Sequence, residues 1–257
     1  CENWRNLISV GANPIAITNC LNFGNPENKK IMGEFAECIL GIKEASEFLN
    51  FPVVSGNVSF YNGTNKKNIF PTPVIGGVGL IPDISKTLNH NFKKENSNIL
   101  LIGKTFGHIE QSCFLKENFS ISEGLPPEIN LNNEKNNGET VLQLIRKNLV
   151  LSVHDVSSGG LLVSLSEMSI GSDLGAKIYK PKKLNNKFEY FFGEDQGRYI
   201  IEVEKANLEK VIKMLNDSEV YYENIGKTQV KNFEVESEFN IGVNDLFKIN
   251  NQWYSNY

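Results

Sequence analysis

The sequence lacks the features that mark several classes of protein. Its four cysteines, Cys1, Cys20, Cys38 and Cys113, form no CxxC pair and adjoin none of the three histidines, so we expect neither a disulfide framework nor a zinc site. The formal net charge of -4 leaves no basic excess, which argues against a nucleic-acid partner. No apolar run approaches the roughly 18 residues of a membrane span, and no signal peptide opens the chain. We therefore expect a cytoplasmic protein without a membrane partner.

An initiator methionine is also absent. The opening "CENWRNLISVG" begins directly in a predicted helix, with Trp4, Leu7 and Ile8 at helical spacing. We therefore expect a fragment whose upstream part is missing. The 257 residues are enough for one large domain or two small ones, and we favour two.

Residues 1–92 have the pattern of part of an α/β domain. The segments "NPIAIT", "FPVV" and "PVIGGVGLI" are short and apolar, as buried strands are. Between the first two, the glycine- and asparagine-rich "NCLNFGNPENKK" is predicted to be a loop, and a long amphipathic helix follows over 31–49. A helix between strands is typical of an α/β layer.

Residues 84–98 are polar and are predicted to connect this domain to a second one, over 93–257. The predicted strands of the second domain are "ILLIG", "LVLSVHD", "GAKIY", "RYIIEVE" and "EVYYENIGKTQV", and its predicted helices cover 111–118, 139–148, 161–169 and 208–216. The segment "NLNNEKNNGE" is predicted to be a low-complexity polar loop.

Three familiar catalytic or binding motifs are excluded. In "IGKTFG", the GK pair lacks the earlier glycine of a phosphate-binding loop, because Asn98 stands there. In "GGVGLIP", Pro82 replaces the third glycine of the dinucleotide fingerprint. His154 and Asp155 are neighbours on a predicted strand, where successive side chains point to opposite faces, so we expect no catalytic triad.

The stretch "VVSGNVSFYN" interrupts an apolar run with Ser55, Gly56 and Asn57. A strand interior normally avoids glycine, which gives up the most backbone entropy and supplies no side chain to pack. Two interpretations remain open. The segment is either a tight turn, which these residues form readily, or a place where another group approaches the backbone closely.

Two further stretches have oxygen donors near a helix. In "SVHDVSSGGLLVSLSEM", a strand ends at Asp155 and a Ser-Gly turn opens a helix, whose N-terminus favours phosphate while Asp155 holds Mg²⁺. Alternatively, Ser157 or Ser158 only caps the helix. In "CENWRNLI", Glu2 and Asn6 lie one turn apart and present oxygens to one point, as a Mg²⁺ site requires, although an exposed polar pair explains them too.

Polar side chains also collect in two loops. "FFGEDQGRYIIEV" has a polar turn before a strand, which a plain hairpin turn explains equally well. In "ITNCLNFGNPE", Asn19, Asn22 and Asn25 are predicted to project from the loop after a strand, where α/β proteins bind ligands.

Taken together and in this order, these stretches resemble one family. "PIAITNCLNFGNPE", "PVVSGNVSFYN" with "PTPVIGGVGLI", "SVHDVSSGGLLVSLSEM" and "FFGEDQGRYIIEV" are similar to the C-terminal half of phosphoribosylformylglycinamidine synthase, the large synthetase subunit of its multi-subunit form. The resemblance covers 1–203, and "LNFGNPE" and "SGNVSFYN" are its most specific parts. The remaining residues add only a compatible rhythm of strands and helices.

The resemblance implies a fold and a reaction. The fold is that of the aminoimidazole ribonucleotide synthetase superfamily, here a partial α/β domain of the N-terminal type followed by an α+β domain of the C-terminal type. The reaction is that of a ligase in purine biosynthesis. ATP and Mg²⁺ activate an amide oxygen of formylglycinamide ribonucleotide, and ammonia from a glutaminase subunit displaces the phosphate. A small bridging subunit completes the assembly.

The resemblance also implies roles for single residues. Asn19 and Gly56 would bind ATP, Asn57 would ligate Mg²⁺, and Ser59 would contact the ribonucleotide substrate. The family has an aspartate where this chain has Asn19, whose neutral amide carries no charge. At a pseudo-symmetric site that holds an auxiliary ADP in larger relatives, the metal ligands correspond to Glu2, Asn6 and Asp155, and Ser157 lies at the nucleotide.

The family's catalytic histidine belongs to the N-terminal half, which this chain lacks. We therefore expect the isolated chain to be inactive, with one sheet edge or face uncovered and a tendency to form a homodimer. Two other functions remain open. The chain could be another ATP-dependent member of the superfamily, such as a thiamine-monophosphate kinase or a selenophosphate synthetase, or a non-catalytic interaction domain that keeps the fold.

Overall fold

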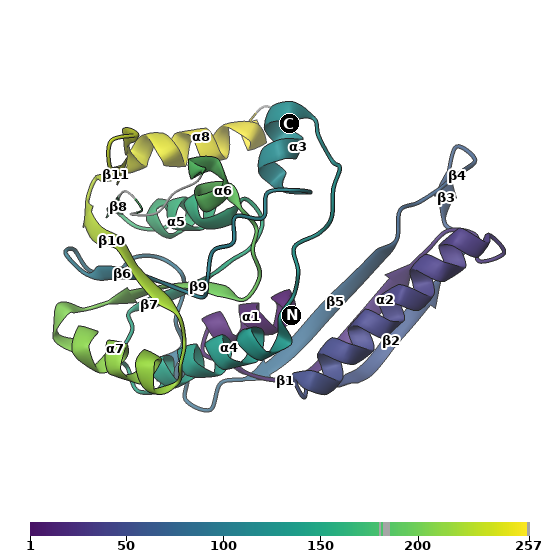
Figure 1. Ribbon diagram of the computed structural model, residues 1–257, viewed down its shortest axis with the longest axis horizontal. Coiled ribbons are helices and arrows are strands. Elements are labelled where there is room, and N and C mark those ends of the chain that lie inside the picture. Colours follow the sequence, from purple (N-terminus) through teal and green to yellow (C-terminus); the bar gives the residue numbers. More distant parts are fainter. Residues whose placement is uncertain (180, 182–185, 256–257) are drawn as a thin grey trace.

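Two sheets organise the chain in the computed structural model, which describes residues 1–179, 181 and 186–255. A three-stranded sheet and its long helix form one region, and a seven-stranded sheet with helices on both faces forms the other (Figure 1). A two-stranded ribbon of β3 and β4 projects from the first region. None of the described helices has the length and apolar character needed to cross a membrane.

The first region has the order β2-β1-β5, with β1 parallel to β2 and antiparallel to β5. Its elements are α1 (Glu2–Ser9), β1 (Asn13–Asn22), α2 (Lys29–Phe48), β2 (Val53–Ser59), β3 (Gly63–Thr64), β4 (Lys67–Asn68) and β5 (Thr72–Leu80). The predicted opening helix, long amphipathic helix and glycine-rich strand are therefore confirmed.

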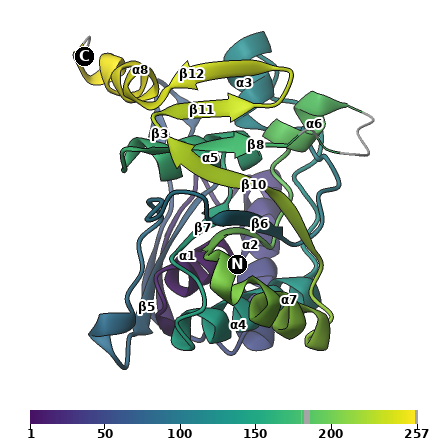
Figure 2. The ribbon, with the colours of Figure 1, turned by 90° about the vertical axis from the view of Figure 1, so that its left-hand side faces the viewer.

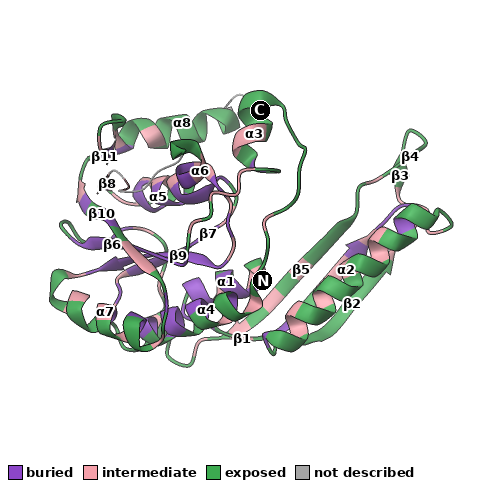
Figure 3. Cartoon of the chain, in the orientation of Figure 1, coloured by how far each residue is buried: buried purple, intermediate pink, exposed green. Residues whose placement is uncertain are grey.

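Both helices pack on the same face of this sheet. A Cβ atom on Gly77 of β5 would lie 1.8 Å from the Asn3 side-chain oxygen, so the absence of a side chain lets α1 approach the strand. The opposite face carries Val74, Val78 and Leu80, which are 54%, 59% and 56% exposed. Figure 3 shows how much of β2, β5 and α2 is exposed. Within the described part of the chain, helices cover only one face of this sheet.

One prediction about this region is wrong, and one of two open interpretations is excluded. Strand β1 continues through Asn19 to Asn22, which were expected to lie in a loop, and β2 runs without a turn through Ser55, Gly56 and Asn57. The reason is long-range pairing. Asn19 lies opposite Gly56, and Asn22 lies opposite Ser59, so the ladder outweighs the local preference of Asn and Gly for turns.

The second region is a seven-stranded sheet in the order β12-β11-β8-β10-β6-β9-β7. Its strands are β6 (Asn98–Ile102), β7 (Ser152–Val156), β8 (Leu174–Ile178), β9 (Arg198–Val203), β10 (Tyr222–Val230), β11 (Asn232–Val235) and β12 (Phe239–Gly242). Its helices are α3 (Cys113–Phe119), α4 (Leu131–Arg146), α5 (Gly160–Ile170), α6 (Lys187–Phe192), α7 (Leu208–Asp217) and α8 (Val243–Ser255), with short 3₁₀ turns η1 (Ile84–Lys86) and η2 (Lys205–Asn207).

Each face of this sheet has its own apolar core. Alternate residues of β6 and β9 pack against α4 and α7 on one face, and the residues between them pack against α5 and α6 on the other. Figure 2 shows the sheet between these two helical layers. Trp4 and Ile8 of α1 belong to the first core, so α1 contacts both regions of the molecule.

The polar segment "NLNNEKNNGE" is helical, contrary to the prediction of a loop, and forms the first half of α4. The Asn130 side chain caps the helix by accepting a hydrogen bond from the Asn133 N–H. Glu134 is buried against Arg5 of α1. Tertiary contacts therefore stabilise a helix that the amino-acid composition of this segment did not predict.

Candidate functional site

Asn19 and Gly56, the two predicted ATP-binding residues, are neighbours. They lie opposite each other on β1 and β2. A Cβ atom on Gly56 would lie 1.9 Å from the Asn19 Oδ1 and 2.7 Å from the Asn19 carbonyl oxygen. The glycine is therefore required by a close approach rather than by a turn, and the approaching group in this structure is the Asn19 amide.

Asn19 also lines a hollow of about 420 Å³ between α2 and the edge strand β2. Its other walls include the apolar side chains of Ile39 and Ile42 and the cationic side chain of Lys43. The Asn50 amide and the Glu47 carboxylate line it as well, and Glu47 lies 4.0 Å from the Lys43 ammonium, so the hollow combines apolar walls with paired charges and amide groups.

Asn57 and Ser59, the predicted metal and substrate ligands, point to the other face of β2, because side chains alternate along a strand. Thr18 and Ser55 share a hydrogen bond of 2.8 Å between their hydroxyl groups on that face. Asn57 is exposed, and the Ser59 hydroxyl is within hydrogen-bond distance of the Asn62 side chain. A row of small oxygen donors therefore borders the uncovered face of the sheet.

The second predicted group meets at α1 and β7. The Asn6 amide packs against the Asp155 carboxylate, and its nitrogen, turned toward that group, donates hydrogen bonds of 3.0 and 3.2 Å to the two carboxylate oxygens. Glu2 lies one turn earlier on α1 and is exposed. The structure thus brings Asn6 and Asp155 together from positions far apart in the sequence.

The donors in both groups suit Mg²⁺, which prefers oxygen ligands and is often held by one or two protein groups plus substrate phosphates. If the Asn6 amide turns over, its oxygen replaces the nitrogen beside the Asp155 carboxylate, and the oxygens of both side chains then face one point. No cluster of three or more His, Cys, Asp and Glu side chains suited to a metal occurs among the described residues. This arrangement fits a metal shared with a phosphate better than an all-protein metal cage.

His154 contacts Asp155, contrary to the expectation that neighbours on a strand face apart. The His154 Nδ1 lies 3.5 Å from the Asp155 Oδ1, and the Nε2 lies 3.1 Å from Glu167 on α5. Burial alone lowers the pKa of His154, but the hydrogen bonds and charges of the two carboxylates outweigh it and raise the pKa to about 9. At neutral pH Asp155 therefore faces a charged imidazolium on one side and Asn6 on the other.

The turn that contains Ser157 differs from a simple capped helix. Helix α5 begins after Gly159, whose φ is 81°, and neither serine supplies a side-chain cap. The interpretation that Ser157 or Ser158 only caps the helix is therefore wrong. Instead, the Glu194 carboxylate accepts a hydrogen bond of 2.7 Å from the Gly159 N–H.

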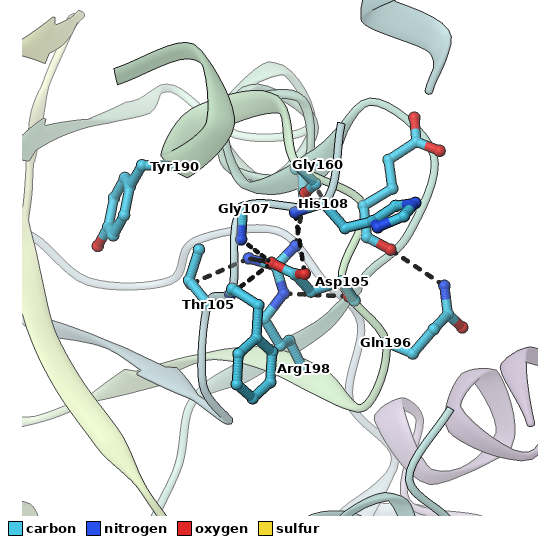
Figure 4. A network of polar contacts seen from close by, with 12 residues as sticks. Thr105, Gly107, His108, Gly160, Tyr190, Asp195, Gln196 and Arg198 are labelled. Carbon is cyan, nitrogen blue, oxygen red and sulfur yellow. Dashed lines mark hydrogen bonds and ion pairs between the residues drawn. The ribbon is translucent and has the colours of Figure 1, made fainter. Parts of the chain in front are cut away.

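The "GEDQG" segment connects α6 to β9, so the hairpin interpretation is also wrong. The Asp195 carboxylate accepts hydrogen bonds from the backbone N–H groups of Phe106, Gly107 and His108 at 2.9 to 3.1 Å. Figure 4 shows Asp195 pointing into this loop beside the buried Arg198. The glycine loop that was excluded as a phosphate-binding motif thus binds an internal carboxylate.

Two residues of this neighbourhood, Arg5 and Glu134, were missed from the sequence. Arg5 is fully buried, and its guanidinium contacts the Glu134 carboxylate and the Gln196 amide oxygen, each at 2.7 Å. Burial raises the pKa of Glu134, although Arg5 acts in the opposite sense. Glu134 and Gln196 also line a hollow of about 440 Å³ beside the 104–108 loop. The sequence did contain one indication that Arg5 is buried, because this residue falls on the apolar face of its helix with Trp4 and Ile8.

The predicted residues therefore form two groups. Asn19, Gly56, Asn57 and Ser59 lie on the adjacent strands β1 and β2, whereas Asn6, Asp155 and Ser157 lie at α1 and the turn between β7 and α5. Each group combines small oxygen donors with glycine, and the second is bordered by buried charged side chains.

The chain is similar to curated proteins over its whole length. It is 52% identical over 257 residues to phosphoribosylformylglycinamidine synthase subunit PurL of Pelagibacter ubique, and 43% identical over 256 residues to the subunit of the same name from Rhodopseudomonas palustris strain BisB5. These matches cover all of this chain but only 35% of each relative. The resemblance inferred from the sequence is confirmed.

Solved structures share the fold. Thermotoga maritima PurL complexed with FGAR matches with a TM-score of 0.71 at 16% identity, over 95% of this chain and 41% of that one. The hydrogenase maturation protein HypE matches with a TM-score of 0.63 at 12% identity, over 94% of this chain and 79% of that one. At such identities the likeness shows the fold alone.

Two family models match the two regions. The N-terminal domain of AIR synthase related proteins matches residues 1–81, and the C-terminal domain of the same family matches 94–237. The expected fold class, an α/β domain followed by an α+β domain of this superfamily, is therefore confirmed. Because the C-terminal model alone covers more than half of the residues, this chain belongs to the AIR synthase related protein family.

Proposed function

We propose that this chain forms part of a phosphoribosylformylglycinamidine synthase, an ATP- and Mg²⁺-dependent ligase of purine biosynthesis in the cytoplasm. The supporting observation is the 52% identity to a PurL subunit across the entire chain. A further support is that Asn19, Gly56 and Asn57, where the resemblance expects ATP and its metal, lie on the paired strands β1 and β2.

The proposed reaction explains the need for these donors. An amide oxygen is a very poor leaving group, so ATP phosphorylates the glycinamide carbonyl oxygen of formylglycinamide ribonucleotide and leaves as ADP. Ammonia then attacks the carbon that bears the phosphorylated oxygen, and inorganic phosphate departs to leave the amidine. In this scheme Asn19 and Gly56 bind ATP, and Ser59 contacts the ribonucleotide. Mg²⁺, held in part by Asn57, would neutralise the phosphate charge.

The second group would bind an auxiliary nucleotide such as ADP. Asp155, Asn6 and Glu2 would hold its metal ion, and Ser157 would lie beside the nucleotide. The support is the contact between Asn6 and Asp155, two residues that are far apart in the sequence and adjacent in the fold.

The remainder of the enzyme would come from another segment. The chain spans about a third of the length of the curated relatives it matches. We propose that the missing N-terminal half covers the exposed face of β5 and brings the catalytic histidine, and that the chain alone does not turn over. A glutaminase subunit would supply the ammonia, with a small bridging subunit; a neighbour of this fold is named PurLQS.

Calorimetric titration with Mg·ATP tests the ligand assignment. The wild-type chain is expected to bind, and Asn57→Ala is expected to weaken binding roughly tenfold, the equivalent of about 1.4 kcal/mol. Asn240→Ala, which removes another exposed strand asparagine from β12, is the matched control and should bind as wild type. Absence of any Asn57-dependent binding would favour a non-catalytic scaffold.

A chimera tests the activity. This chain replaces the matching third of the Pelagibacter PurL subunit, and formation of the amidine from ATP, ammonia and formylglycinamide ribonucleotide is measured. We expect turnover in the chimera, a large loss with Asn57→Ala, and none from the chain alone. A folded chimera without activity, beside an active parent, would count against the proposed function.

A further inference from the structure

Arg5 links α1 to two separate elements of the second region. Its guanidinium donates one hydrogen bond to Glu134 of α4 and another to Gln196 of the loop before β9, both at 2.7 Å. The side chain is fully buried, and Glu134 is 1% exposed. A buried guanidinium with two partners has little freedom, because its donors form a rigid planar fork.

From Gln196 the hydrogen bonds continue to the turn that opens α5. The Gln196 side-chain N–H donates to the Glu194 carbonyl oxygen at 3.1 Å. The Glu194 carboxylate in turn accepts from the Gly159 N–H at 2.7 Å and from the Cys113 N–H at 2.8 Å. Gly159 follows Ser157 by two positions, so the series ends beside the proposed nucleotide-binding turn.

The same arginine also fixes the other side of that site. Asn6 follows Arg5 on α1, and its amide packs against Asp155 at the end of β7. The position of α1 over β7 therefore determines whether the Asn6 side chain contacts Asp155. Replacing a buried ion pair with apolar residues is often neutral or stabilising, so stability alone gives a weak reason for a charge here.

We propose that Arg5 and Gln196 are positioning residues, which together set the distance between Asn6 on α1 and the Asp155–Ser157 turn. Neither residue belongs to the proposed ligand set of Glu2, Asn6, Asp155 and Ser157. Their role in binding rests on the proposed auxiliary site, but the positioning itself is independent of any ligand and is measured without one.

Gln196→Met tests the positioning directly. The substitution keeps the length of the side chain and removes both of its hydrogen bonds. We expect hydrogen exchange of the Gly159 amide, followed by NMR, to rise roughly tenfold, while the amides of β6 and β9 keep their protection. Gln143→Met, at an exposed position of α4, is the matched control and should leave the Gly159 amide unchanged.

Gln196→Glu separates the effects of the two hydrogen bonds that the Gln196 side chain forms. A carboxylate still accepts from Arg5 but no longer donates to the Glu194 carbonyl oxygen. We therefore expect faster exchange at Gly159 with unchanged protection of the α1 amides, whereas Gln196→Met loosens both. Equal effects of the two substitutions on the exchange of the α1 amides, or Gly159 exchange within twofold of wild type in both variants, would overturn the proposal.

Mn²⁺ titration, with the metal alone as the probe, connects positioning to binding. In wild type we expect binding that Asp155→Asn weakens, and Gln196→Met is expected to weaken it roughly tenfold without altering the Asn57-dependent binding of Mg·ATP. If exchange changes as described but wild type has no Asp155-dependent Mn²⁺ binding, the positioning role stands and the ligand role of Asp155 fails. If Gln196→Met weakens both sites equally, the effect is general destabilisation and the proposal is wrong.

Discussion

The two sheets of this protein differ in how far the chain covers them. Every residue of β9 in the seven-stranded sheet is buried, because helices lie on both faces. In β2 of the three-stranded sheet, every residue before Ser59 is exposed. The described residues therefore form one region with a complete core and one whose apolar face they leave uncovered.

The difference also separates the two groups of candidate residues. The hydrogen bonds of Arg5 and the turn after Asp155 lie in or against the seven-stranded sheet, whose core is complete. The geometry of both is therefore determined by contacts within this chain. Asn57 and Ser59 lie on the exposed edge strand of the incomplete region. Their environment depends on whatever covers the sheet, in agreement with the short span of this chain relative to its relatives.

The largest expected effect is a loss of stability from truncation in the complete core. Leu101 is fully buried in β6, so Leu101→Ala should lower the free energy of unfolding by about 3 kcal/mol, measured by chemical denaturation. Val78→Ala, on the uncovered face of β5, should cost less than about 0.5 kcal/mol at low protein concentration. Equal costs would remove the distinction between the two regions.

The uncovered face should also promote self-association in the isolated chain. Val78 is 59% exposed, and both β2 and β5 are edge strands. Sedimentation is expected to show dimers at high concentration, with a dissociation constant that Val78→Lys raises at least roughly tenfold, because a lysine would be desolvated at the contact. Val230→Lys places the same charge at a 50% exposed valine of β10 and serves as the control. A strict monomer at high concentration would contradict this prediction.

The smallest expected effect is a pH dependence from the complete region. Burial raises the pKa of Glu202 above its ordinary 4.5, although hydrogen bonds from the Lys93 and Lys94 N–H groups and from the Ser152 hydroxyl oppose the change. The stability that this carboxyl contributes is present below its unfolded pKa and is lost as pH rises through the higher folded pKa.

Glu202→Gln removes the titration. The advantage of wild type over this variant in free energy of unfolding should therefore shrink as pH rises from about 4.5 to neutrality. Denaturation at several pH values, with the exposed Glu139→Gln on α4 as the substitution control, measures the trend. An advantage that grows with pH would show that hydrogen bonding rather than burial decides the pKa of Glu202.

Much of the fold could be predicted because its elements have strong periodic patterns. The strands β5, β6 and β9 and the helices α2, α5 and α7 were predicted to within a few residues, since their apolar residues follow strand or helix spacing. The first half of α4 was missed because asparagine and glycine have low helix propensity, and its buried face is defined by long-range contacts such as those of Glu134 with Arg5 and of Asn137 with Gly197. The continuous β2 was missed for a similar reason, since pairing with β1 overrides the turn preference of Ser, Gly and Asn.

The candidate residues divide in the same way. The long and specific motifs of the resemblance assigned Asn19, Gly56 and Asn57 to one site. The structure pairs the first two residues on adjacent strands. No local pattern joins Asn6 to Asp155 or Arg5 to Gln196, because these contacts cross long stretches of sequence.

The sequence by itself determined the family, the residue types at each candidate position and most of the helices and strands, because these depend on local spacing and on long motifs. Only the tertiary structure decided which oxygen donors meet, why Gly56 tolerates no side chain, and where a charge is buried. Such properties arise from residues that are distant in the chain and adjacent in space, so their energies depend on packing that no single segment specifies.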